Sequence, residues 1–220
     1  MLIFAADTSL ESASVALIRD NHVLHELTVN NHKKHATTFM PMVEHCFSES
    51  VINVSEVDLF AISGGPGSFT GLRIGMSSMK TMAYALNKKM VVVPTLDILA
   101  SQSKEENKII CPIINARNNQ VYTAIYNTVK LTEDMAIPIE ELAEILKKYD
   151  SEVVLSGDAA SMHLELLTEK LKNKVTFNIE NTFPKASVCG LIAFKYDKIE
   201  AKEALPFYVR SSQAERLFNK

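Results

Sequence analysis

The residues with the clearest potential for chemistry form a glycine-rich turn at positions 62–75, with the sequence Ile-Ser-Gly-Gly-Pro-Gly-Ser-Phe-Thr-Gly-Leu-Arg-Ile-Gly. Glycine permits backbone angles that other residues avoid and proline fixes φ, which predicts a tight strand-to-helix turn. Ser68 or Thr70 can cap the helix that follows, and free N–H groups there attract anions. The motif is neither a P-loop nor a dinucleotide fingerprint, so a turn that only connects two elements remains an open alternative.

Metal ligation has little support in the sequence. None of the six histidines lies four residues from another, the spacing that places two ligands on one helix face. His22 and His25 are three apart, as are His32 and His35, but the first pair falls in a predicted strand, where this spacing points to opposite faces. Three widely separated cysteines without CxxC spacing indicate buried thiols. We therefore predict no metal and no cofactor.

Hydrophobic periodicity predicts the elements that position the turn. In the first half we expect three strands, a helix, a strand, a helix, a strand and a helix, at residues 1–6, 14–18, 23–29, 32–49, 57–62, 72–86, 90–93 and 95–101. Pro41 lies within the first helical pattern and predicts a kink or a late helix start.

The same order of elements returns after a polar linker. The expected ranges are 109–114, 120–129, 131–137, 139–149, 153–155, 159–171, 174–177 and 186–196. A duplicated βββαβαβα order predicts an α/β protein with two lobes, 1–102 and 103–205, each with antiparallel strands followed by parallel strands through right-handed crossovers. We expect residues 206–220 to include a last helix that packs back on the first lobe.

Ligands of such sheets bind at the carboxyl ends of the strands. In this chain those ends carry polar residues and glycines, which we expect to face a cleft between the lobes. The candidate residues for a cleft or nucleotide site are Asp7, Thr8, Ser9, Gly65, Gly67, Ser68, Asn115 and Asp158.

Composition narrows the class of protein. The 220 residues are 47% hydrophobic and 22% charged, with a formal net charge of −3. This balance argues against a chain that coats nucleic acid by itself. The apolar N-terminus lacks a basic segment and Asp7 interrupts it, while no apolar run approaches the roughly 20 residues that span a membrane. We therefore expect a cytoplasmic protein with no membrane contact.

Several of these residues together resemble the TsaB (YeaZ) family of bacterial tRNA threonylcarbamoyladenosine biosynthesis proteins. The strongest match is the unbroken run at 65–75, together with the Asp-Thr-Ser that ends the first strand and Phe-Met-Pro-Met-Val at 39–43. The second half matches more loosely, in Ala116-Arg117, Val121-Tyr122, Gly157-Asp158, Pro206 and Tyr208-Val209-Arg210.

The resemblance implies two ribonuclease H-like lobes of the acetate-kinase/Hsp70/actin superfamily. It also implies a non-catalytic subunit that binds a TsaD-like enzyme. That enzyme transfers a threonylcarbamoyl group to adenosine 37 of tRNAs reading ANN codons, and a TsaE-like ATPase completes the assembly. tRNA would then be met indirectly, through the complex.

ATP-hydrolysing relatives of this fold carry a carboxylate at the end of the first strand of each lobe, where the pair organises Mg²⁺. Here the first is Asp7, but its counterpart is Asn115, where the family more usually has Asp. An amide binds Mg²⁺ more weakly and cannot act as a base. Asp158 either supplies charge or is ordinary turn chemistry, and Asp7 is either a ligand or a capping residue. We predict no catalytic residue in this chain.

The helices at 32–49 and 72–86 carry more apolar surface than one sheet can cover, so part of it is expected to meet a partner. The alternative is that both helix faces belong to the core. A helix pair from each of two subunits would form a four-helix bundle, and the same surface would support a homodimer when the partner is absent. The predicted interface residues are Phe39, Met40, Val43, Phe47, Leu72, Gly75, Met76, Met79, Met82 and Ala83.

Two enzyme classes remain as alternatives. The first is a nucleotide-dependent phosphotransferase or ATPase of the same fold that uses Asp7 and the glycine turn. The second, with less support from the residues, is a metallopeptidase.

Overall fold

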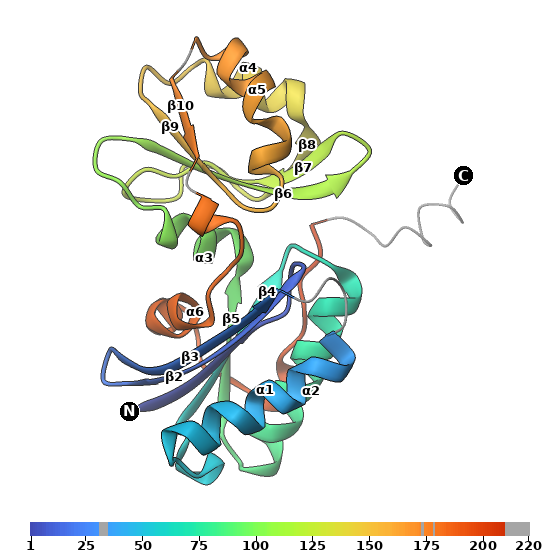
Figure 1. Ribbon diagram of the computed structural model, residues 1–220, viewed down its shortest axis with the longest axis vertical. Helices are drawn as coiled ribbons and strands as arrows, with labels where there is room; N and C mark the ends of the chain where they lie inside the picture. The colour runs from blue at the N-terminus through green and yellow to red at the C-terminus, as the bar shows by residue number, and fades with distance from the viewer. Residues whose placement is uncertain (31–34, 173, 178, 210–220) are drawn as a thin grey trace. The chain divides into compact units, whose positions relative to one another are not determined.

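Strand pairing divides the chain between two sheets, one in each of two structural units (Figure 1). The computed structural model describes residues 1–30, 35–172, 174–177 and 179–209. Unit 1 comprises Met1–Ile98 and Pro184–Phe207, and unit 2 comprises Leu99–Phe183 with 208–209 of the described tail. Among the described residues, no helix has both the length and the apolar character that crossing a bilayer requires.

The sheet of unit 1 has the strand order β11-β5-β4-β1-β2-β3. Its strands are β1 (Leu2–Asp7), β2 (Ser12–Arg19), β3 (His22–Asn30), β4 (Leu59–Gly65), β5 (Lys89–Pro94) and β11 (Ile199–Glu200). The first three strands form an antiparallel meander, and β4 and β5 then continue the sheet parallel to β1. This is the predicted arrangement, except that β11, which pairs antiparallel with β5, was not predicted.

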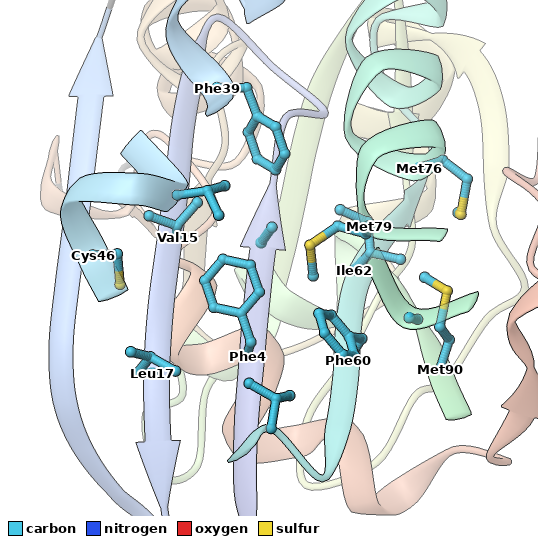
Figure 2. Packing of buried hydrophobic residues seen from close by; sticks show 14 of the residues in the cluster. Phe4, Val15, Leu17, Phe39, Cys46, Phe60, Ile62, Met76, Met79 and Met90 are labelled. Atoms are coloured by element: carbon cyan, nitrogen blue, oxygen red, sulfur yellow. The ribbon is translucent and has the colours of Figure 1, made fainter. Parts of the chain in front are cut away.

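Helices cover both faces of this sheet, which explains why every residue of β1 is buried. On one face, α1 (His35–Ser50) and α2 (Phe69–Ala85) pack over Phe4 and Phe60, as Figure 2 shows. On the other face, α6 (Ala186–Ile192) packs over alternate residues of the same strands.

The two helices of the first face begin close to where the sequence predicts. α1 runs through Pro41, and its expected start at residues 32–34 lies outside the described residues. α2 begins at Phe69, three residues earlier than predicted, because Ser68 is its N-cap. The Ser68 hydroxyl oxygen accepts a hydrogen bond from the N–H of Gly71 at 3.3 Å, which confirms one of the two predicted caps.

Unit 2 repeats the same topology with the strand order β10-β9-β6-β7-β8. Its elements are α3 (Thr95–Gln102, which begins in unit 1), β6 (Ile109–Arg117), β7 (Gln120–Thr123), β8 (Met135–Pro138), α4 (Ile139–Leu146), β9 (Val153–Ser156), α5 (Ala160–Lys170) and β10 (Val175–Phe177). Three strands are again antiparallel, and β9 and β10 are parallel to β6. β7 ends at Thr123, earlier than predicted, although Tyr126 still bridges to Ile110 of β6. The chain turns back only after Tyr126, which also bridges to Lys130.

The segment 184–207 groups with unit 1, which differs from the expected second lobe of 103–205. The reason is the packing of α6. A side chain at Gly190 would meet Ile18 and Ala5, so glycine lets this helix lie directly on the sheet. The N–H of Ala186 donates to the Ser14 hydroxyl at 3.1 Å, which ties the helix start to β2.

The chain after α6 runs back over unit 1. The N–H of Phe207 donates to the carbonyl of Gly64 at 3.0 Å. Most of the helix expected within 206–220 falls at 210–220, outside the described residues.

Candidate functional site

The glycine turn and the end of β1 form one packed cluster in unit 1. The N–H of Ser68 donates to the carbonyl oxygen of Ser9 at 2.7 Å. The hydroxyl of Thr8 donates to the carbonyl oxygen of Gly71 at 2.8 Å. The first of these bonds uses an N–H group that the anion-binding hypothesis would leave free for a ligand.

Three glycines make this close packing possible. A Cβ atom on Gly67, Gly71 or Gly75 would come closer than 3.0 Å to Ser9 or Thr8, a distance that real Cβ atoms essentially never show. At the first two positions the clash would be with a backbone carbonyl oxygen, and at Gly75 it would be with the Thr8 hydroxyl. The glycine spacing therefore fits the start of α2 onto the end of β1.

Asp7 lies within this cluster and is fully buried. Its two carboxylate oxygens accept hydrogen bonds from Ser9, one from the N–H at 3.2 Å and one from the hydroxyl at 2.8 Å. An aspartate whose side chain accepts a hydrogen bond from the N–H two residues later forms an Asx turn, which is a common arrangement in loops. Burial raises the pKa of Asp7 to about 6, partly offset by the hydrogen bonds from Ser9.

The corresponding strand end in unit 2 holds Asn115 and Asp158. The N–H of Asn115 donates to the Asp158 carboxylate at 2.9 Å, and the Asn115 side-chain oxygen accepts from the N–H of Arg117 at 2.8 Å. Gly157 precedes Asp158 with φ 93°, a conformation that favours glycine. Asp158 thus joins the α5 start to the end of β6, as the turn interpretation predicts.

The structure therefore brings the eight candidate cleft residues together in two groups. The unit 1 group contains Asp7, Thr8, Ser9, Gly67 and Ser68. Gly65 adjoins it at φ 121°, where a side chain would meet the backbone of Phe207. The second group, Asn115 and Asp158, lies in unit 2. A shared cleft for both groups stays a prediction.

The described residues contain no group of three or more histidine, cysteine or acidic side chains placed to hold a metal ion. His35 is buried, and its Nε2 atom lies 2.8 Å from the carbonyl oxygen of Leu10, while His32 is outside the described residues. All three cysteines are free and buried. Burial raises the pKa of the Cys111 thiol to about 12, which makes it a poor nucleophile.

Most of the predicted interface residues are core residues of unit 1. Burial removes all of them except Val43, which also lines the groove described below, from any docking surface, so this part of the interface prediction is wrong. The apolar stripes of α1 and α2 face a sheet of six strands that is wide enough to cover both helices side by side (Figures 1 and 2). Gly75 is buried against Thr8 rather than open to another helix. The buried residues are Phe39, Val43, Leu72, Gly75, Met76, Met79 and Ala83.

The remaining interface residues, Met40, Phe47 and Met82, line an apolar groove of about 910 Å³ on unit 1. Met40 is 48% exposed, and the other two are partly exposed. We call this surface the α1–α2 groove. The sequence prediction did not include the other apolar residues that line this groove. The available signal was that the polar residues ending α1 are followed directly by apolar residues. These further residues are Val51, Ile52, Val54, Ala85 and Leu86.

Comparison with known proteins gives the chain a family. The family model described as "TsaD: tRNA N6-adenosine threonylcarbamoyltransferase" matches residues 22–214. The tRNA threonylcarbamoyladenosine biosynthesis protein TsaB of Bacillus subtilis is 28% identical over 98% of this chain and 96% of its own. The protein of the same name from Buchnera aphidicola subsp. Schizaphis graminum is 31% identical over 94% of this chain and 99% of its own.

Solved structures agree on the fold. YeaZ from Pseudomonas aeruginosa has a TM-score of 0.78 and 26% identity, over 94% of this chain and 99% of that chain. The ROK hexokinase from Thermus thermophilus has a TM-score of 0.50 and 11% identity, over 89% of this chain and 98% of that chain. This likeness concerns the fold alone. The predicted two-lobed fold of the acetate-kinase/Hsp70/actin superfamily is thereby confirmed. Because relatives named TsaB match this chain over almost their full length, the chain belongs to the TsaB (YeaZ) family.

Proposed function

We propose that this chain is a non-catalytic subunit that binds a TsaD-like enzyme and supports the formation of N6-threonylcarbamoyladenosine at position 37 of tRNAs reading ANN codons. The observation that carries the proposal is the α1–α2 groove in a member of the TsaB family. A TsaE-like ATPase belongs to the same assembly, and the groove supports a homodimer in the absence of the enzyme.

The groove suits a helix from another protein. Its walls come mainly from two neighbouring helices, and Met40 and Met82 supply flexible thioether side chains that adapt to a partner surface. An apolar helix laid into such a groove is a common mode of protein recognition. An exposed apolar hollow of this size on unit 1 also has an energetic cost in water that a partner would remove.

The groove is bounded by a residue in an unfavourable conformation. Val51 has φ 52° and is 91% exposed, directly after the end of α1. The N–H groups of Val51 and Ile52 donate to the carbonyls of Ser48 and Phe47, the pattern of a Schellman cap, in which glycine normally occupies the Val51 position. A branched apolar side chain at this position is explained if it contacts a partner.

The unit 1 and unit 2 strand ends support the non-catalytic part of the proposal. Asp7 is buried and hydrogen-bonded by Ser9, and Asn115 offers an amide where catalysis of phosphoryl transfer would need a carboxylate. The N–H of Ser68 is already bonded to Ser9.

Co-purification of the chain with a TsaD-like enzyme from the same organism tests the proposal. Met40→Glu places a charge in the α1–α2 groove and is expected to weaken the complex at least tenfold, because the carboxylate would be desolvated at the contact. Met162→Glu, at a methionine that is 62% exposed on α5 of unit 2, is the matched control and is expected to bind as wild type.

Both variants must unfold at the wild-type temperature for the comparison to hold. Wild-type affinity of Met40→Glu would remove the groove from the proposal. Calorimetry of the isolated chain with Mg-ATP tests the alternative: micromolar binding with turnover would identify a phosphotransferase instead.

A further inference from the structure

A second hollow, of about 450 Å³, lies at the edge of unit 2 where α4 and α5 end. Among its described lining residues one side chain, Asp150, is a carboxylate, and Tyr149 supplies an aromatic ring. The other charged side chains are all cationic. We call this site the lysine pocket, after Lys147, Lys148, Lys170, Lys172 and Lys174.

The fold brings these lysines together from two separate connections. β9 and β10 are parallel neighbours, so the loops that enter them from α4 and α5 lie at the same edge of the sheet. Lys147 and Lys148 directly follow α4, and Lys170 ends α5. Lys172 has φ 54° and turns the chain back toward β10.

Lysines at helix ends have a local function, because they offset the partial negative charge of the last carbonyls. Two helix ends carry roughly one negative charge together. Asp150 adds one, and Glu144, which is 2.6 Å from Lys147, adds another. Five lysines exceed this local requirement, and the pocket keeps a positive excess.

The lysines are free to meet a ligand. Among the described residues, Lys147 and Lys174 form ion pairs with carboxylates that are 64% and 96% exposed, and exposed pairs of this kind contribute little stability. Within the described part of the chain, Lys148 and Lys172 are exposed and have no ion-pair partner. Flexible ammonium groups around a hollow can therefore turn toward an anion that enters it.

We propose that the lysine pocket binds the phosphate backbone of RNA, an inference that rests on the proposed function because that function makes tRNA the substrate of the complex. Lysine contacts with phosphate position a nucleic acid without reading its sequence, which suits a subunit that does no chemistry on the base. The chain has a formal net charge of −3, so contact with a polyanion needs a local excess of cations such as this one. A concave site fits a backbone segment better than a flat lipid surface.

Filter binding of an unmodified tRNA transcript to the full chain, at 50 and 200 mM salt, tests the inference. Lys148→Glu combined with Lys172→Glu is expected to weaken binding roughly tenfold at 50 mM salt and to lower the slope of log affinity against log salt by about two, since two phosphate contacts are lost. Lys104→Glu combined with Lys195→Glu makes the same change of net charge at exposed lysines outside the pocket and is expected to remain within about twofold of wild type.

Equal losses in both double variants would overturn the inference, because the effect would then come from net charge. Competition by polyglutamate as effective as that by RNA would assign the pocket to an acidic protein, and saturation by millimolar inorganic phosphate would assign it to a small anion. Lys148→Gln combined with Lys172→Gln repeats the test without charge reversal if the first variant unfolds. Binding of the TsaD-like enzyme to the wild-type chain is measured in parallel, so that failure of the proposed function is seen separately from failure of this site.

Discussion

Asp7 ends β1, and the ionisation of its carboxyl group affects the stability of unit 1. In the structure it is fully buried and bonded to Ser9, and burial raises its pKa to about 6. A carboxyl group in this state costs stability whenever it is ionised.

The pH dependence of stability follows from that pKa. The folded state holds the Asp7 proton more tightly than the unfolded state, so wild-type stability falls as pH rises from about 4 to about 6 and then levels off. A rise from 3.8 to about 6 corresponds to roughly 3 kcal/mol. Asp7→Asn removes this dependence while it keeps an oxygen acceptor for Ser9.

Urea denaturation at pH 4 and pH 7.5 measures the effect. The stability of Asp7→Asn relative to wild type should increase by up to about 3 kcal/mol between the two pH values. Asp197→Asn, at an exposed position, controls for the loss of one negative charge. A relative stability that does not change with pH would contradict the buried-carboxyl explanation.

Val51 is a second residue that is expected to lower the stability of the fold, through its own backbone conformation. Its left-handed backbone conformation is unfavourable for a branched side chain by about 1 kcal/mol. Val51→Gly should therefore raise the free energy of unfolding by about that amount, measured by thermal denaturation, because glycine fits the helix cap. Val129→Gly, at a valine that is 63% exposed, is expected to be neutral or destabilising. A destabilised Val51→Gly would show that the cap conformation is not the source of the cost.

At the scale of elements, the contact between α2 and β1 explains why the turn and the start of α2 contain closely spaced glycines. Gly71 and Gly75 are one turn apart on α2 and both face Thr8. At Gly71 the obstacle to a side chain is the Thr8 backbone oxygen, whereas at Gly75 it is the Thr8 hydroxyl. Backbone cannot move away as a side chain can, so the two positions should respond differently to the same substitution.

Gly71→Ala and Gly75→Ala should each destabilise unit 1 by roughly 1–3 kcal/mol, measured by chemical denaturation. Adding Thr8→Ala should recover much of the loss at Gly75, because it removes the hydroxyl, but little of the loss at Gly71. Equal recovery at both positions, or none at Gly75, would mean that these contacts do not determine the position of α2.

For the whole molecule, the C-terminal segment is the feature that changes the domain description. α6 covers one face of the unit 1 sheet through Ala186, Cys189 and Ile192. β11 then extends the same sheet beside β5. Unit 1 therefore consists of two stretches of chain that are separated in sequence by all of Leu99–Phe183.

A fragment of residues 1–98 should fail to unfold cooperatively, because the face that α6 covers would be exposed to water. The same fragment joined by a flexible linker to residues 184–207 should recover a cooperative transition by circular dichroism. The control joins 1–98 by the same linker to 139–162, a stretch of similar length from unit 2. Cooperative unfolding of 1–98 alone would show that the segment is dispensable for unit 1.

The duplicated order of strands and helices, the glycine turn and the family could all be predicted from the amino-acid sequence. Alternation and helical spacing are local properties of the chain, so β1, α2 and β9 fall close to their predicted ranges. The run at 65–75 was specific enough to indicate the TsaB family, and three of its glycines, Gly67, Gly71 and Gly75, pack closely against Thr8 or Ser9.

Which apolar surface stays exposed depends on tertiary packing and could not be predicted from the sequence. Met76 and Met40 look equally suited to a partner in the sequence, but the first is 4% exposed and the second 48%. The placement of α6 and the gathering of five lysines around one pocket likewise depend on contacts between distant stretches. Periodicity shows that a helix face is apolar, whereas the width of the sheet and the neighbours packed on it determine whether that face is covered.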